Sequence, residues 1–300
     1  MICSEADPPV RGRRPRRPFC FFAAALLLAA ADFKGLLEQG QLHYSQGEWE
    51  PAQQALSNAT KLSPKSFEAR FLLGATLVQL NRSIDAIREL GIACRLNPKH
   101  RDAAKLLAIE YAKNDNTPES ITLLAPMVDD KPFDEEIHLL LIEAYEESGD
   151  AGRALQLAAR TLERFPHSAA ANYWMGMQLR DAGRFPEAKP FLEKALRLYP
   201  DYQLAYVASG DLALKQEQYE EAARYFRMAL SKKADDAEAH IGLSRALVAM
   251  NQLSSAIETL ERAIELTPDP RIHLELSHLY LRTGDRARAA KEAELFRQKK

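Results

Sequence analysis

Histidine, cysteine and acidic side chains can hold a metal ion or transfer protons, but their spacing in this chain fits neither task. The closest two of the seven histidines, His273 and His278, are five residues apart, which places them on different faces of a helix. The three cysteines, Cys3, Cys20 and Cys94, lack the CxxC spacing of a zinc site. We therefore expect no bound metal ion.

The sequence also lacks the motifs of common enzymes. It contains no GxGxxG or GK[ST] phosphate loop, no GxSxG nucleophile turn and no HExxH metal motif. Acidic pairs such as Asp129-Asp130 and Glu146-Glu147 fit solvated helix surfaces better than a proton-transfer site. We therefore expect no enzymatic activity and no cofactor. The formal net charge of −2 argues against a nucleic-acid partner, because phosphate binding requires a basic surface.

A period of 34 residues organises most of the chain. Steps of 34 residues from Pro200, in both directions, reach five further prolines and one alanine. These positions are Pro64, Pro98, Pro132, Pro166, Ala234 and Pro268. A proline suits the end of a helix, so each period is expected to hold two helices joined by a tight turn. The predicted turns are centred on Gly47, Asn81, Asp115, Gly149, Gly183, Glu217, Asn251 and Gly284.

Small residues recur where the two helices of a period would cross. With periods starting near residues 33, 67, 101, 135, 169, 203, 237 and 270, position 20 is alanine or serine in all eight. These residues are Ala52, Ala86, Ser120, Ala154, Ala188, Ala222, Ala256 and Ala289. The pattern resembles the tetratricopeptide repeat (TPR) family over residues 32–300. The resemblance implies an all-α solenoid of about eight helix-turn-helix repeats that form a right-handed superhelix. Pro126 and Pro190 fall inside second helices and should disturb them locally, so the third repeat is the expected weak point.

In the TPR family, the first helices line a concave groove that holds a peptide or a partner's helix. The family's groove positions 2, 5, 9, 12 and 13 carry over to a set of apolar and charged residues in the middle of this chain. The candidate binding residues are Leu139, Glu143, Tyr173, Met177, Arg180, Val207, Asp211, Ile241 and Arg245. They predict an apolar channel with an acidic wall on its N-terminal side. The alternative is that neighbouring helices bury part of this apolar strip.

Residues 1–31 have a different composition from the repeats. An arginine-rich stretch from Arg11 to Arg17 precedes the uncharged run from Phe19 to Ala31, which ends in three alanines. This order is typical of a secretory signal peptide, so we expect cleavage near Ala31 and export to the periplasm or the medium. The apolar run is too short for a stable membrane span, which needs about 20 residues. Two alternatives remain: an anchor resting on the membrane, or an extension from a misassigned start that leaves the protein cytoplasmic.

Two classes of function fit these observations. The first is a non-enzymatic scaffold or adaptor that binds a peptide or partner subunit in the concave groove. The second is a targeting or regulatory subunit of a separate enzyme, such as a glycosyltransferase or protease complex. Family membership specifies the architecture, and the partner must be identified from the binding surface.

Overall fold

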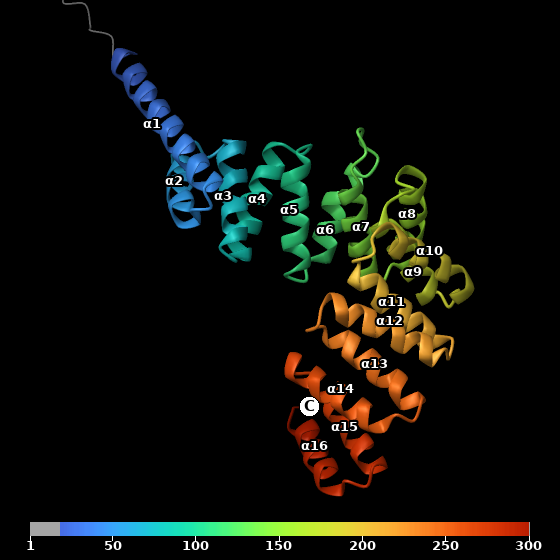
Figure 1. Ribbon diagram of the computed structural model, residues 1–300. Coiled ribbons are helices and arrows are strands. Elements are labelled where there is room, and N and C mark those ends of the chain that lie inside the picture. Colours follow the sequence, from blue (N-terminus) through green and yellow to red (C-terminus); the bar gives the residue numbers. More distant parts are fainter. Residues whose placement is uncertain (1–18, 300) are drawn as a thin grey trace, which may run out of the picture. The chain divides into compact units, whose positions relative to one another are not determined.

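Paired helices account for the architecture throughout the part of the chain that the computed structural model describes, residues 19–299. Over this range every regular element is helical, which confirms the predicted all-α solenoid (Figure 1). The chain divides into two compact units between Asn116 and Thr117. The first unit contains α1 (Phe19–Ser45), α2 (Trp49–Leu62), α3 (Phe67–Gln79), α4 (Ser83–Leu96) and α5 (Arg101–Ala112).

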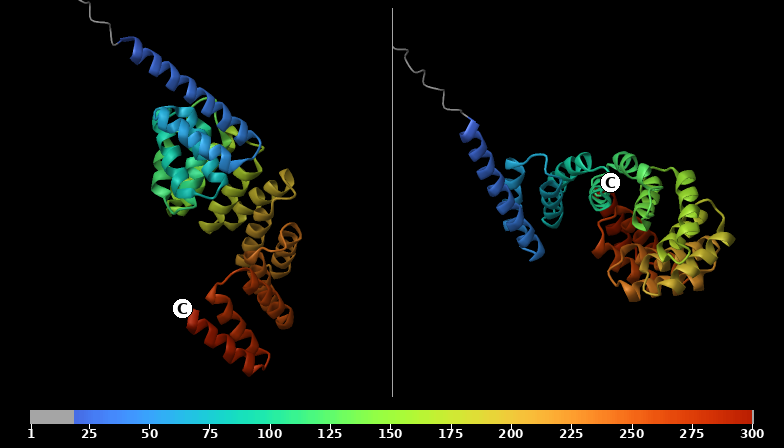
Figure 2. Two further views of the ribbon diagram at one scale, coloured as in Figure 1. Left: turned by 90° about the vertical axis from the view of Figure 1, so that its left-hand side faces the viewer. Right: turned by 90° about the horizontal axis from the view of Figure 1, so that it is seen from above.

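The second unit continues the helix pairs from Thr117 onward. Its elements are α6 (Thr117–Leu124), the 3-10 helix η1 (Ala125–Met127), α7 (Glu135–Glu147), α8 (Ala151–Arg164), α9 (Ala169–Asp181), α10 (Phe185–Leu198), α11 (Gln203–Lys215), α12 (Tyr219–Lys232), α13 (Ala237–Ala249), α14 (Leu253–Leu266), α15 (Pro270–Arg282) and α16 (Arg286–Lys299). Each second helix contacts the first helix before and after it in this unit, and the pairs stack side by side (Figure 2).

The eight predicted turns are confirmed by their backbone geometry. The central residue of each turn has a positive φ, from 54° at Asn81 to 84° at Gly284. Glycine and asparagine tolerate this left-handed conformation, which allows the chain to reverse directly after a helix. Glu217 adopts it at φ 60° in the turn between α11 and α12, without glycine's freedom. The turn geometry therefore fixes the register of both helices in every repeat.

Close helix contacts explain the small residues at two positions of each repeat. A Cβ added at Gly176 in α9 would lie 2.7 Å from the side chain of Leu192 in α10, and one added at Gly210 in α11 would lie 2.8 Å from Phe226 in α12. Position 20 is buried in all eight repeats, including Ala188 and Ser120. The two helices of a repeat therefore pack against each other through these positions.

Ala188→Leu should lower the free energy of unfolding by about 1–3 kcal/mol, because the larger side chain overpacks a crossing with no free space. The half-buried Lys194 in the same helix provides a control, and Lys194→Gln should change that free energy by about 0.5 kcal/mol at most. Urea unfolding followed by circular dichroism measures both. Equal midpoints for the two variants would contradict the assigned helix register.

The third repeat departs from the regular pattern, as its prolines predict. Its second helix, α6, ends at Leu124, and Pro126 lies in the 3-10 helix that follows. Proline cannot donate the backbone hydrogen bond that would continue an α-helix, which explains the early end. The boundary between the two units also falls within this repeat, between α5 and α6. By contrast, α10 continues past Pro190 to Leu198.

A buried histidine joins α7 to α8 through a fully paired set of hydrogen bonds. His138 Nδ1 lies 3.0 Å from Thr161 Oγ1, whose hydroxyl donates to the Leu157 carbonyl, so Nδ1 must carry the proton. Its Nε2 lies 3.2 Å from Arg164 Nη1 and accepts from it. Burial, reinforced by the charge of Arg164, lowers the pKa of His138. The fold therefore requires the neutral imidazole.

Stability should consequently fall as the pH is lowered through the ordinary histidine pKa of about 6.5. The unfolded chain binds a proton at His138 more readily than the folded one, so acid favours unfolding. His138→Gln keeps one acceptor and one donor but cannot titrate. The difference in urea midpoint between pH 7.5 and 5.5 should therefore be smaller in this variant than in the parent. An unchanged difference would show that another group carries the pH dependence.

Candidate functional site

The candidate binding residues lie on consecutive first helices of the second unit, which contact one another. Helix α7 contacts α9, α9 contacts α11, and α11 contacts α13. The nine residues predicted from the repeat register therefore lie on neighbouring helices, and together they are here called the first-helix surface. Its members are Leu139 and Glu143 of α7, Tyr173, Met177 and Arg180 of α9, Val207 and Asp211 of α11, and Ile241 and Arg245 of α13.

The apolar members of this surface are more enclosed than an open channel would be. Tyr173 is 8% exposed and Ile241 is 6% exposed, so neighbouring helices cover most of both side chains. Leu139, Met177 and Val207 are half-buried and leave apolar area accessible to a partner. Leu204, one turn before Val207 in α11, is 50% exposed. The accessible apolar strip is therefore formed mainly by these four side chains.

Two arginines on this surface already have partners within the chain. The Arg180 guanidinium donates to Asp181 Oδ1 at 2.8 Å and to Asp211 Oδ2 at 3.4 Å, which joins α9 to α11. Burial raises the pKa of Asp211, and the charge of Arg180 opposes that rise. Arg245 pairs with Glu275 of α15 at 2.9 Å and remains largely exposed. Arg180 therefore orients neighbouring helices, whereas Arg245 is accessible to a second carboxylate.

Glu143 differs from these charged residues because its exposed carboxylate makes no hydrogen bond or ion pair with the rest of residues 19–299. Although the side chain reaches solvent, neighbouring atoms displace part of the water around its carboxylate and raise its pKa, and repulsion from Glu147 raises it further. The charge of Glu143 in turn adds to the raised pKa values of Tyr173 and Tyr202, for which burial is the larger cause. Glu143 thus lies within electrostatic range of both phenols. A cationic group bound here would satisfy the one unpaired charge of the site.

An aromatic cluster extends from this carboxylate to the edge of the surface. The ring of Tyr173 lies 5.3 Å from that of Trp174 and 5.2 Å from that of Tyr202, and Tyr202 lies 5.8 Å from Tyr199. Tyr199 is exposed. The repeat register did not predict Tyr199 and Tyr202, because both precede α11 in the connection between repeats. The available signal in the sequence was the presence of three tyrosines and one tryptophan within a single repeat, residues 169–202.

Potential metal-ligating and nucleophilic side chains are scattered over the described part of the chain. Among residues 19–299, histidine, cysteine, aspartate and glutamate side chains do not gather in groups of three or more that could hold an ion. Cys94 is buried in α4, and this burial raises the pKa of its thiol to about 11. A thiol of that pKa is protonated at neutral pH and is a poor nucleophile or ligand. Over the same range, every helix is too short or too polar to cross a bilayer.

Family models described as tetratricopeptide repeat match residues 100–169, 167–233 and 213–274, which together cover more than half of the chain. The chain is a tetratricopeptide repeat protein. The first 75 residues of this TPR protein's helical region, 19–93, match a model described as subunit 3 of the anaphase-promoting complex, or cyclosome. The predicted family and repeat pattern are thereby confirmed.

Relatives of this TPR protein share its repeats over part of their length. Subunit 7 of the mouse anaphase-promoting complex is 26% identical over 219 residues, which are 73% of this chain and 33% of that protein. The human protein O-mannosyl-transferase TMTC1 is 24% identical over 172 residues, 55% of this chain and 19% of that protein. The chain thus spans a third or less of each. A TPR protein from Parabacteroides merdae has the same fold, with a TM-score of 0.70 at 15% identity over 84% of this chain and 99% of that one.

Proposed function

We propose that this TPR protein is a non-enzymatic scaffold that binds a segment of a partner protein on the first-helix surface of its second unit. The unpaired carboxylate of Glu143, within electrostatic range of the Tyr173 and Tyr202 hydroxyls, carries the proposal. An unpaired carboxylate favours a lysine or arginine side chain, which can pair with its charge, and the exposed ring of Tyr199 in the same aromatic cluster can receive a cation over its face.

The other residues of the first-helix surface indicate which side chains the partner segment should carry in addition to that basic residue. The half-buried Leu139, Met177 and Val207 and the exposed Leu204 offer apolar contacts beyond the aromatic cluster. The exposed Arg245 can accept a carboxylate further along the segment. We therefore expect the partner segment to combine a basic residue near α7 and α9 with apolar residues over α9 and α11. An acidic residue should follow near α13.

The runner-up proposal is a targeting or regulatory subunit of a separate enzyme. The similarity to a stretch of an O-mannosyl-transferase supports it, because repeats of this kind occur there in a protein named for its enzymatic activity. The similarity to a subunit of the anaphase-promoting complex supports the broader proposal of a protein that assembles with others.

Affinity capture from the native host, followed by enzyme assays on the captured complex, distinguishes the two proposals. For a scaffold, the partner binds through the first-helix surface and its own activity, if it has one, stays the same when this chain is removed. For a regulatory subunit, removal changes the turnover or the substrate choice of the captured enzyme. If Glu143→Arg does not reduce the amount of partner captured, the partner does not bind the first-helix surface, whether this chain is a scaffold or a regulatory subunit.

We also propose export, with the cytoplasmic and membrane-anchored states as alternatives. The arginine-rich part of the predicted signal, up to residue 18, lies outside the described residues. The apolar part begins α1, which runs without interruption from Phe19 to Ser45. Cleavage near Ala31 would leave the part of α1 in which buried Gly40 packs against Leu56 of α2. N-terminal sequencing of the protein from its own host tests this proposal, and an intact Met1 on cytoplasmic protein would reject it.

A further inference from the structure

A cleft in the first unit lies between α2 and α4, with α3 as its floor. Its volume is about 380 Å³, and Leu73 and Leu77 of α3 supply apolar surface at its base. The corresponding space between α10 and α12, over α11, is about 10 Å³. Tyr225 of α12 occupies the repeat position that Glu89 holds in α4. A large aromatic side chain thus helps to fill one cleft, while a shorter carboxylate leaves the other open.

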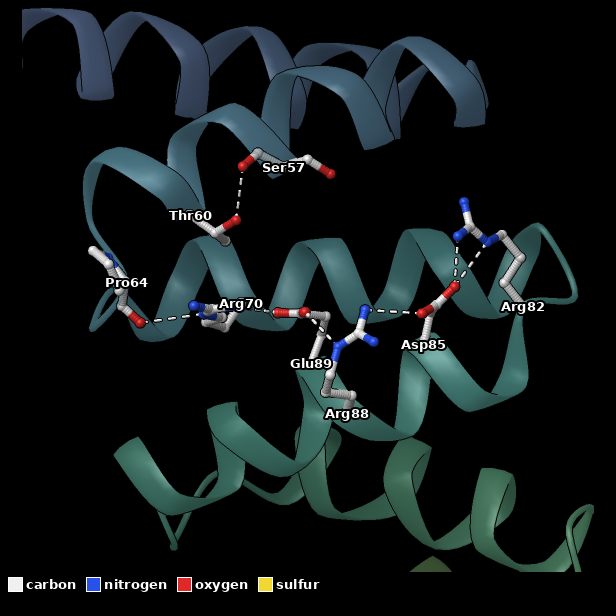
Figure 3. A network of polar contacts seen from close by, with 8 residues as sticks. All are labelled: Ser57, Thr60, Pro64, Arg70, Arg82, Asp85, Arg88 and Glu89. Atoms are coloured by element: carbon white, nitrogen blue, oxygen red, sulfur yellow. Dashed lines mark hydrogen bonds and ion pairs between the residues drawn. The ribbon is translucent and has the colours of Figure 1, made fainter.

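A continuous row of ion pairs runs along this cleft (Figure 3). Arg82 donates to Asp85 Oδ2 through Nε at 3.1 Å and Nη2 at 2.5 Å, and Arg88 Nη2 donates to Asp85 Oδ1 at 2.8 Å. Arg88 Nε also donates to Glu89 Oε1 at 3.3 Å. The buried Glu89 pairs at its other oxygen with Arg70. The two carboxylates therefore hold all three guanidinium groups in fixed orientations.

After these ion pairs are formed, the cleft still has an excess of positive charge and guanidinium N–H groups without a hydrogen-bond acceptor within residues 19–299. Lys61, Arg70, Arg82 and Arg88 line the cleft together with only two acids, Asp85 and Glu89, which leaves a net charge of +2. Arg70 uses Nη1 and also Nε, which donates to the Pro64 carbonyl at 3.2 Å. Each of the three guanidinium groups thus retains one terminal nitrogen without a partner in the described chain. Groups already held in place lose little entropy when they bind a ligand.

We propose that the cleft between α2 and α4 binds a partner segment that presents two carboxylate side chains. The backbones of Arg82 and Arg88 are about 9 Å apart along the helix axis, and both guanidinium groups reach from there toward Asp85 between them, so the two groups lie closer together than the backbones do. Side chains two residues apart on an extended peptide point to the same face and are about 7 Å apart. Two aspartates or glutamates at that spacing can each meet one guanidinium and together neutralise the excess charge of +2. Apolar residues of the segment can contact Leu73 and Leu77.

The arrangement of the donors favours spaced carboxylates over a single phosphate. A phosphate group is best held by donors that converge on one point. Here Asp85 and Glu89 separate the three arginines along the row, so their free nitrogens are spread out (Figure 3). This site lies wholly in the first unit and does not depend on the proposed function of the second.

Selection from a random octapeptide library on the full chain, with counter-selection on an R82Q/R88Q variant, tests the proposal. Peptides that bind the parent but not the variant should carry two acidic residues separated by one other residue. A synthetic peptide of this kind should bind the variant at least about tenfold more weakly in fluorescence anisotropy. Changing its two acidic residues to the corresponding amides should abolish binding to the parent.

A matched variant, R184Q/R224Q, controls for the loss of two charges. Arg184 occupies the same repeat position as Arg82, is equally exposed at 48%, and pairs with Glu187 three residues on. Arg224 corresponds to Arg88 and pairs with Glu221. This variant should bind the acidic peptide as the parent does. Equal loss in both double variants, selected peptides without paired acids, or displacement by inorganic phosphate but not by sodium chloride of equal ionic strength would each overturn the proposal.

Discussion

Replacing Phe226 with alanine should lower the free energy of unfolding by about 3–5 kcal/mol. Phe226 is wholly buried in α12, and its ring fills the space between Gly210 of α11 and Gly242 of α13. Its removal would leave a cavity at the contact between the sixth and seventh repeats. Because each repeat is stabilised mainly by its neighbours, the loss should be concentrated there. Urea unfolding and faster amide hydrogen exchange in α11 and α13 would measure it.

Met228, in the same helix, provides the control for this substitution. It is 40% exposed, and Met228→Ala should change the free energy of unfolding by about 0.5 kcal/mol. Exchange rates in α11 and α13 should match those of the parent. If the two substitutions shifted the urea midpoint equally, Phe226 would not be the packing centre that joins these repeats.

The second large effect concerns binding. Tyr173→Ala should weaken the binding of a captured partner by at least about tenfold, because the Tyr173 ring supports Trp174 and Tyr202, and loss of an aromatic group from a binding site often costs about 2 kcal/mol or more. The substitution removes the ring between Trp174 and Tyr202, within electrostatic range of Glu143. Isothermal titration calorimetry with the captured partner gives the change in Kd directly.

Because Tyr173 is 8% exposed, its loss also reduces stability, and the control must do the same. Tyr206 of α11 is 9% exposed and lies outside the first-helix surface. Tyr206→Ala should therefore lower the melting temperature to a similar degree while leaving Kd unchanged. A matching loss of affinity in both variants would mean that the effect of Tyr173 is one of folding rather than contact.

The sequence was sufficient to predict the helix register, because one physical requirement recurs in every repeat. A reversal of the chain needs a left-handed residue, and a close crossing needs a small one, so Gly183 and Ala188 reveal the phase of their repeat. Eight repetitions of the pattern removed the ambiguity that a single helix pair would have left. The same regularity placed Tyr173, Val207 and Ile241 on neighbouring helices before the structure was known.

The burial and ion pairing of the candidate binding residues depend on contacts that the 34-residue period does not predict. How closely α9 and α11 approach decides that Tyr173 is buried and that Arg180 pairs with Asp211. The cleft between α2 and α4 was missed for a related reason. Glu89, Leu157 and Tyr225 hold the same repeat position and line the space between successive second helices. Only the structure shows that this position faces that space, so the sequence alone could not indicate that Glu89 leaves the cleft open.

Site-specific photocrosslinking in the native host tests the central claim, that partners bind the first-helix surface, most directly. Benzoylphenylalanine at Leu204, which is 50% exposed in α11, would report on this surface, and the same group at the exposed Arg227 of α12 would report on the second-helix side. We predict a covalent adduct with one partner from position 204 and none from position 227. Adducts from position 227 alone, or with equal yield from both, would contradict the account.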